Sequence, residues 1–185
     1  MGESYPAFLA GQRITASMLA SAQPVVARKT ADTARAAVAT VSPDPHLQFD
    51  VVAGGVYTMD GWIKYDGPTA ADLLLDFSAP SGTEGEWLGW GVGHSPIISF
   101  STGAAIVTDS QQSRGYPVRV EANDVTSAKS FGCLGVGAAL TMVLMSTVRV
   151  GPVGGVYSLD WSQQTSDASP VTLFTDSWLR LQRIA

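Results

Sequence analysis

From Leu47 to the end of the chain, apolar and polar residues alternate with a period of two. Two runs show the apolar positions most clearly: Tyr57, Met59, Ile63 and Tyr65, and then Ala71, Leu73, Leu75 and Phe77. Such alternation turns one side of a strand toward a core and the other side toward water. Shorter runs of the same kind begin at Val118, Val148, Val156, Val171 and Trp178. The pattern predicts an all-β chain built from many short strands.

Turn-forming residues separate these runs. Clusters of glycine, proline and small polar residues occupy positions 53–55, 66–68, 79–82, 114–117, 151–152 and 154–155. Many short strands with frequent turns are typical of a sandwich, a jelly roll or a barrel. Gly54–Asp60 also resembles Gly154–Asp160, either as equivalent turn-then-strand segments of two halves of a sandwich or by chance. We therefore expect a jelly-roll-like antiparallel β-sandwich.

The first residues differ from the rest and predict a short helix over Ile14–Gln23. Thr15 can accept a hydrogen bond from an early amide as the N-cap, and Pro24 stops the helix. Ile14, Met18 and Leu19 would form its apolar face. Two helical turns do not persist alone in water, so this helix must dock on another surface. That surface is either its own domain or a larger assembly, for which these three residues would be the anchor.

The next segment allows two interpretations. Asp32–Val38 has the composition of a second short helix, and Val25–Arg35 is equally compatible with an extended strand. Residues 1–35 are expected to form an N-terminal attachment segment, and residues 36–185 the jelly-roll-like β domain.

Composition and charge narrow the class of protein. Apolar residues make up 45% of the chain and charged residues 15%, which is typical of a packed globular protein and suggests an oligomer. The net charge is −5 and the basic residues are scattered, so no nucleic-acid partner is expected. Eight acids stand between Asp44 and Glu86 with one base, Lys64. They indicate solvated strand faces and turns rather than a cation site, since no calcium-loop motif is present.

Cysteine content and hydropathy exclude other classes. Cys133 is the single cysteine, so no intrachain disulfide forms, and a buried structural thiol is expected. The first six residues lack the basic and apolar parts of a secretory signal. Phe131–Val148 carries no charge, but its glycines and β-branched residues favour two buried strands over a membrane helix. No membrane insertion is expected.

The sequence offers no convincing catalytic or metal site. Gly93-His94-Ser95 is not a nucleophile elbow, and Glu84 and Glu86 share a strand face without a third group to support hydrolysis. His46 and His94 are too few for a metal centre unless subunits share them around a symmetry axis. We therefore expect no enzyme activity and no cofactor.

Two tryptophans are the best candidates for a binding surface. Trp87 precedes the glycine-rich stretch Gly89–Gly93 and Trp90 lies within it, and this stretch lacks the spacing and the following helix of a dinucleotide loop. Tryptophans fill cores and subunit interfaces, and paired ones also stack on sugar rings. A core or interface role is favoured, and a carbohydrate platform of Trp87 and Trp90, or one using Trp62, is the alternative.

Three segments together resemble small structural proteins of actinobacterial tailed phages. They are the opening Tyr5–Leu19, the stretch Lys29–Arg35 with the letters Lys-Thr-Ala-Asp-Thr-Ala-Arg, and the ending Asp176–Ala185. The resemblance is close at these places and loose elsewhere. It implies a minor tail or head-decoration type of protein with a trimeric jelly-roll domain like those of C1q and tumour necrosis factor. No collagen-like or coiled-coil stalk is present, which favours a compact knob over a long fibre.

The resemblance and the strand pattern predict a virion surface protein. It would be a homotrimer, attached to phage capsid or tail proteins by its N-terminal segment, and would contribute particle stability or host adhesion. A host cell-surface glycan is a further expected partner if the tryptophans are exposed. Catalytic residues are not implied by the resemblance.

Overall fold

The computed structural model of the protein describes residues 5–6, 8–92, 118–119 and 123–185. His94 and Ser95, and with them the whole expected turn at 114–117, lie outside this part of the chain. The elements in chain order are α1 (Ala16–Ser21), β1 (Val25–Arg28), β2 (Thr33–Arg35), β3 (Ser42–Val51), β4 (Val56–Gly67), β5 (Leu73–Ser78), β6 (Glu84–Val92), β7 (Val118–Arg119), β8 (Asn123–Asp124), β9 (Lys129–Phe131), β10 (Gly135–Arg149), β11 (Gly155–Gln163), β12 (Val171–Leu173) and β13 (Trp178–Arg183).

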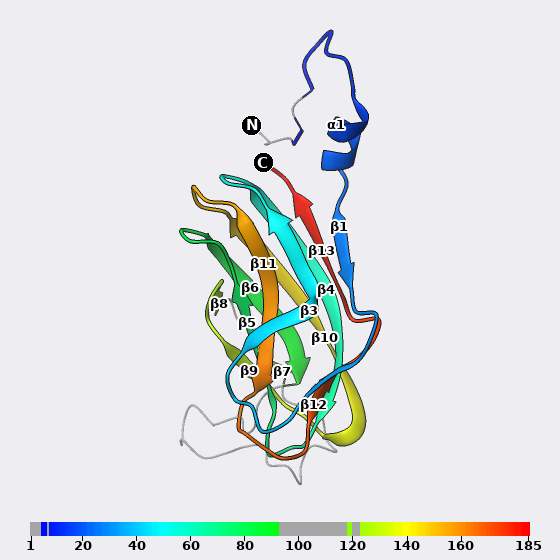
Figure 1. The fold of residues 1–185 in the computed structure, drawn as a ribbon, viewed down its shortest axis with the longest axis vertical. Helices are drawn as coiled ribbons and strands as arrows, with labels where there is room; N and C mark the ends of the chain where they lie inside the picture. Colours follow the sequence, from blue (N-terminus) through cyan, green and yellow to red (C-terminus); the bar gives the residue numbers. More distant parts are fainter. Residues whose placement is uncertain (1–4, 7, 93–117, 120–122) are drawn as a thin grey trace.

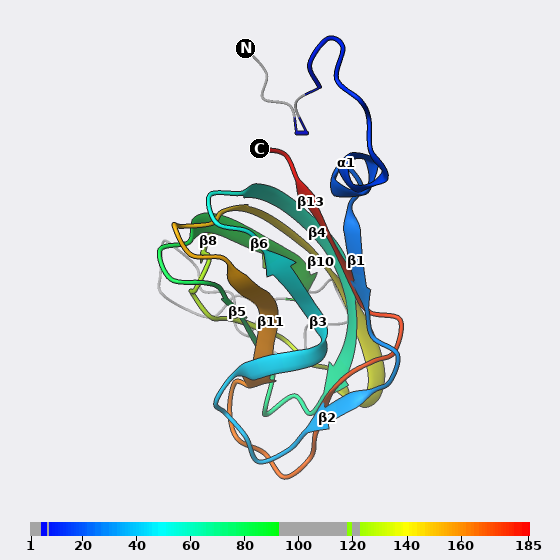
Figure 2. The ribbon, with the colours of Figure 1, turned by 45° about the horizontal axis from the view of Figure 1, so that its top comes forward.

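The strands form two antiparallel sheets that face each other as a sandwich (Figures 1 and 2). The larger sheet has the order β1-β13-β4-β10-β6-β7, with β12 beside β4, β2 beside β12, and β8 beside β6. The smaller sheet has the order β3-β11-β5-β9. This arrangement confirms the jelly-roll-like antiparallel β-sandwich with a small N-terminal helix that the sequence predicts.

Burial follows the predicted period of two. In β4, Met59, Ile63 and Tyr65 are buried against the smaller sheet, while Trp62 between them is partly exposed on the outside. In β5, Leu73, Leu75 and Phe77 alternate in the same way with less buried neighbours. The alternation therefore identifies correctly which side of each strand faces the core.

Aromatic side chains join the two sheets at the centre of the core. Phe77 from the smaller sheet stacks on Tyr157 with ring centroids 5.2 Å apart, and it meets the edge of Trp87 from the larger sheet at 5.4 Å. Trp87 also lies 6.4 Å from Phe131, counted between ring centroids. Such offset and edge-to-face contacts add to the stabilisation that burial of these large rings provides.

The segment after the helix is extended. β1 pairs with β13, and β2 pairs with β12, so the strand interpretation of residues 25–35 is correct and a helix over Asp32–Val38 does not form. The division into residues 1–35 and 36–185 stays a prediction. In the structure, strands on both sides of it are hydrogen-bonded within the larger sheet.

Helix α1 lies beyond one end of the sandwich, the end at which the C-terminus also lies (Figures 1 and 2). Thr15 is its N-cap, as predicted, and its Oγ1 accepts a hydrogen bond from the amide of Met18 at 3.3 Å. None of the six helical residues is buried. The helix is shorter than the predicted Ile14–Gln23: it begins after Thr15, whose backbone is extended, and it ends before the C-cap Ala22.

The uncharged stretch Phe131–Val148 contains the end of β9 and most of β10, one long strand where two were expected. Within the residues the structure describes, no helix is long and apolar enough to cross a membrane. The two similar segments, Gly54–Asp60 and Gly154–Asp160, lead into β4 and β11, which belong to different sheets.

Candidate functional site

A row of large apolar side chains crosses the outer face of the larger sheet. Trp178 of β13 lies opposite Trp62 of β4, Trp62 lies opposite Val143 of β10, and Val143 lies opposite Trp90 of β6. Directly opposed residues of antiparallel strands point to the same face, so four neighbouring strands present these residues side by side. We call these four residues the tryptophan row.

The next row on the same face extends the apolar surface. Met145 of β10 lies between Leu88 of β6 and Asp60 of β4. Asp60 accepts hydrogen bonds from Arg180 of β13 at 2.8 and 3.0 Å, so its charge is paired at the edge of the surface. The tryptophan row together with Met145 and Leu88 forms what we call the outer face.

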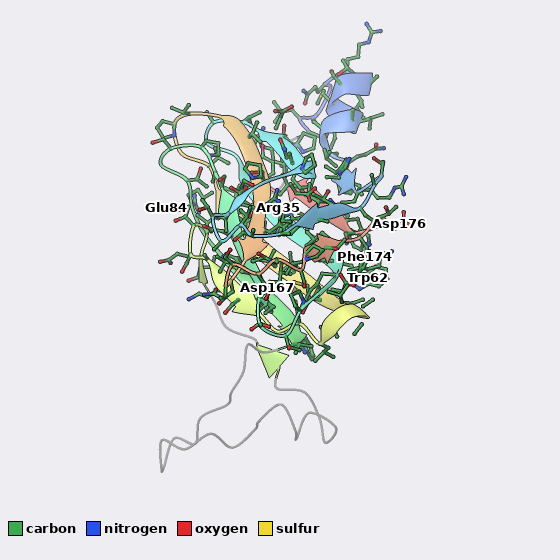
Figure 3. All side chains as sticks on the ribbon, turned by 60° about the horizontal axis from the view of Figure 1, so that its bottom comes forward. Arg35, Trp62, Glu84, Asp167, Phe174 and Asp176 are labelled. Carbon is green, nitrogen blue, oxygen red and sulfur yellow. The ribbon has the colours of Figure 1, made fainter. Side chains whose placement is uncertain are left out.

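The outer face is exposed in the single chain. Trp90 is 62% exposed, Met145 53% and Val143 45%, while Trp62 is 39% exposed. Lys64, the next outward residue of β4, places its Nζ 5.8 Å from the centre of the Trp62 ring. Figure 3 shows Trp62, Phe174 and Asp176 on one side of the molecule and Glu84 on the opposite side. An apolar patch of this kind marks a place where a partner or a ligand binds.

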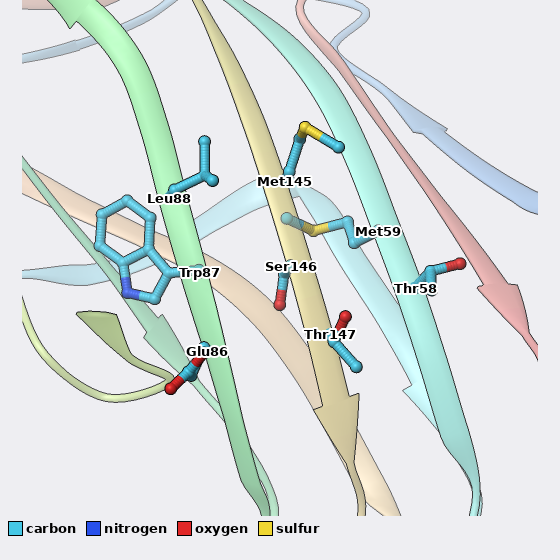
Figure 4. A pocket seen from close by; sticks show the side chains of 8 residues that line it. All are labelled: Thr58, Met59, Glu86, Trp87, Leu88, Met145, Ser146 and Thr147. Carbon is cyan, nitrogen blue, oxygen red and sulfur yellow. The ribbon is translucent and has the colours of Figure 1, made fainter. Parts of the chain in front are cut away.

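A shallow pocket of about 310 Å³ continues from Met145 toward one end of the sheet (Figure 4). Its described lining is Thr58, Met59, Glu86, Trp87, Leu88, Met145, Ser146 and Thr147. Glu86 is the one ionisable group among these residues. The pocket thus offers hydroxyls, one carboxylate and an apolar wall, which suits contact with a partner surface better than acid–base chemistry.

The structure separates the two tryptophans that the sequence paired as a platform. Trp87 is 1% exposed and lies in the core, whereas Trp90 is exposed on the outer face. Residues three apart in a strand point to opposite faces, so the two cannot stack on one ligand. The platform is therefore corrected: Trp87 has the favoured core role, and the residues on the same face as Trp90 are the exposed Trp62 and the half-buried Trp178.

The predicted anchor residues lie on the N-terminal segment outside the sandwich. Ile14 is 57% exposed and Leu19 54%, while Met18 is partly covered. Met18 Sδ accepts a hydrogen bond from Gln12 Nε2 at 3.6 Å. Tyr5 fastens the start of this segment to the sandwich, because Arg183 donates a hydrogen bond to its hydroxyl at 3.0 Å and stacks on its ring at 4.0 Å.

Burial shifts the pKa of two titratable groups that lie away from the outer face, Cys133 and Asp76. Burial, with the nearby Asp72 and Asp66 carboxylates, raises the pKa of the Cys133 thiol to about 12, which fits the predicted inert thiol. Burial also raises the pKa of Asp76, opposed by a hydrogen bond from the amide of Phe77. In the described part of the chain, no three His, Cys, Asp or Glu side chains are grouped to hold a metal ion. His46 is within that part, while His94, its suggested companion, is outside it.

Comparisons with known proteins leave the family open. No family model matches the chain, and no curated protein matches it. Two solved structures that are similar to it are titled as infectious bursal disease virus, Gt strain and Gx strain. The first is 9% identical over 87% of this chain with a TM-score of 0.22, and the second 12% identical over 100% with a TM-score of 0.20. This chain spans 42% of each of them, and likeness at this level carries no argument about function.

Sequence reasoning missed Trp178, Val143 and Met145 as members of the exposed site. Each was correctly placed in a strand, but which residues of different strands meet depends on register. The missing signal is a pairing between strands that are distant in the chain, and a single sequence does not carry it.

Proposed function

We propose that this chain is a non-enzymatic structural protein of a virus particle. Copies of it assemble through the outer face as a homotrimer, and the N-terminal segment holds the assembly on capsid or tail proteins. The observation that carries the self-association is the outer face itself, where Trp62, Trp90, Val143 and Met145 are exposed and Trp178 is half-buried beside Trp62. The virion setting is supported by the sequence resemblance at Tyr5–Leu19, Lys29–Arg35 and Asp176–Ala185.

The composition of the outer face favours a protein partner. Interface cores are rich in tryptophan and methionine and poor in unpaired charge. Here the acid next to Met145, Asp60, is already paired with Arg180. A closed ring of identical subunits covers such a surface on every copy, which an open arrangement does not achieve.

A second, separate surface supports the attachment role. Helix α1 has no buried residue, and a six-residue helix gains too little from its own hydrogen bonds to persist unsupported. Ile14 and Leu19 are therefore available to a partner that differs from the one on the outer face. Two exposed apolar surfaces at different places on the fold suit a protein whose sandwich binds sister copies and whose N-terminal segment binds a different partner.

Light scattering coupled to size-exclusion chromatography tests the self-association. The full chain is expected to elute with the mass of a trimer, and Val143→Glu is expected to elute as a monomer because it puts a charge into the centre of the tryptophan row. Val153→Glu is the matched control, since Val153 is exposed outside the outer face and its replacement should leave the trimer intact. A monomeric wild-type chain, or a trimer that survives Val143→Glu, contradicts the proposal.

A truncation tests the attachment role of the N-terminal segment separately from self-association. A chain without residues 1–24 is expected to remain a folded trimer and to be absent from particles when antibody labelling locates the full chain there. An unfolded truncated product, or one that still joins the particle, would refute the anchor role.

Carbohydrate binding is the second candidate function, and the exposed indoles of Trp62 and Trp90 favour it. They stand on one face with Val143 between them, where sugar rings have access. A glycan array with the purified chain tests this: saturable binding that disappears in Trp90→Ala supports adhesion. No binding to any glycan, or binding unchanged in Trp90→Ala, contradicts carbohydrate binding. Subunit contact would then be the remaining role proposed for the outer face.

A further inference from the structure

A lysine and an aspartate are buried together between the two sheets. Lys29 follows β1 of the larger sheet, and Asp44 lies in β3 of the smaller sheet. Lys29 Nζ is 2.6 Å from Asp44 Oδ2, and both side chains are 0% exposed. Removing two charges from water is costly, and replacing such a pair by apolar residues is often neutral or stabilising. The pair therefore calls for an explanation beyond stability.

Hydrogen bonds from surrounding groups hold the Lys29 amine and the Asp44 carboxyl group in place. Lys29 Nζ also donates to Thr33 Oγ1 at 2.8 Å. Asp44 Oδ2 accepts a second hydrogen bond from Trp161 Nε1 at 3.0 Å, and Oδ1 accepts one from the amide of His46 at 2.9 Å. The amine nitrogen is thus fixed beside the carboxyl group, and each carboxyl oxygen has its own donor.

His46 completes the group. Its Nδ1 lies 3.9 Å from Asp44 Oδ1 and is buried without a hydrogen-bond partner in the described structure. The imidazole side chain is 28% exposed, so its other end can exchange protons with water. An imidazole nitrogen in this position can carry protons to and from the carboxyl oxygen.

We propose that Lys29 and Asp44 condense to an intramolecular isopeptide bond. A bond forms between Lys29 Nζ and Asp44 Cγ, and the bond from Cγ to Oδ1 breaks. The nitrogen loses two protons, which leave with this oxygen as one molecule of water, so an ammonium and a carboxylate become a neutral amide. His46 Nδ1 relays protons toward Oδ1, and Trp161 Nε1 stabilises the negative charge that develops on Oδ2.

The site favours this condensation in two ways. The fold holds the amine and the carboxyl group next to each other in a fixed orientation. Groups held in this way react as though each were present at a very high concentration. The product also suits the site, because the new carbonyl keeps the Trp161 donor and the new N–H keeps the Thr33 acceptor. Two buried charges disappear, and the released water leaves the core. The bond ties β1 to β3 and therefore the larger sheet to the smaller one.

Mass spectrometry of the intact, denatured chain tests the bond directly. The wild-type chain is expected to be lighter than its sequence by one molecule of water, and Lys29→Arg is expected to have the full mass. Lys64→Arg is the matched control, because Lys64 lies outside the pair and its replacement should leave the loss of water in place. A wild-type chain of full mass overturns the proposal, whether or not any variant folds.

Peptide analysis locates the bond. Trypsin should release residues 29–35 joined to residues 36–64 as one branched peptide, since a modified Lys29 is no longer cleaved. Asp44→Asn should form the same amide with loss of ammonia in place of water. Linear peptides ending at Lys29 from wild-type protein overturn the assignment. In chain freshly made by cell-free translation, His46→Gln is expected to lose water more slowly than the wild type, and loss at the wild-type rate overturns the relay role of His46.

Discussion

Replacing Lys29 by methionine is expected to lower the free energy of unfolding by about 3–5 kcal/mol, the usual cost of removing one partner of a buried pair. The reason is that Asp44 remains fully buried with its carboxylate facing Trp161 and no cation beside it. Loss of Lys29 also removes any covalent bond to Asp44, so the variant is less stable than the wild type in either case. Chemical denaturation followed by circular dichroism measures the change.

Arg28→Met provides the matched control in the neighbouring residue. Arg28 pairs with Asp176, but their side chains are 56% and 59% exposed, so solvent screens the interaction. Exposed ion pairs contribute about 0–1 kcal/mol, and the control should fall in that range. If Lys29→Met were no more destabilising than Arg28→Met, the buried pair would not hold the sheets together.

Replacing Trp87 by alanine is expected to lower the free energy of unfolding by about 3–5 kcal/mol, as for other large aromatic residues in cores. Trp87 contacts Phe77 across the sandwich, and also Phe131, so its removal leaves a cavity at the place where the two sheets meet. The loss should be the same at every protein concentration, since the cavity lies inside one chain.

Trp90→Ala is the comparison variant, because Trp90 lies in the same strand as Trp87 but is exposed on the outer face. Under the proposed self-association through the outer face, its effect should grow with protein concentration, because the wild-type side chain would then stabilise association between chains rather than the fold of one chain. Thermal unfolding over a dilution series measures both variants. A Trp87→Ala chain as stable as the wild type would contradict the core packing, and a concentration-independent loss in Trp90→Ala would place its contacts inside the chain.

The period-two pattern was sufficient to predict strands and their buried sides. Tyr65, Leu73 and Phe77 are in the core as the alternation requires, because a strand has two faces and the buried one must be apolar. The helix cap at Thr15 was also predictable, since capping depends on neighbours within one turn. Residues 25–35 were not decided by local preference, and their strand form results from pairing with β12 and β13 at the other end of the chain.

The candidate site was predictable only in part. The sequence identified Trp90 as a possible surface residue, but it could not show that Trp62 and Trp178 stand beside it on the same row. Nor could it pair Lys29 with Asp44, because the two residues come together only when β3 folds over the larger sheet. The neighbouring charged residues also take their partners from distant strands: Asp32 accepts two hydrogen bonds from Thr175, which lower its pKa, and Arg35 lies over the Trp161 ring.

The direction of β1 affects how the molecule bears tension. This strand connects α1 to the sandwich and runs along the long axis beside β13, to which it is joined by four residue pairs (Figure 1). A pull on α1 along that axis acts parallel to the strand, so all four pairs resist sliding at the same moment instead of peeling apart in turn. Such a pull would therefore load the four residue pairs between β1 and β13 in shear.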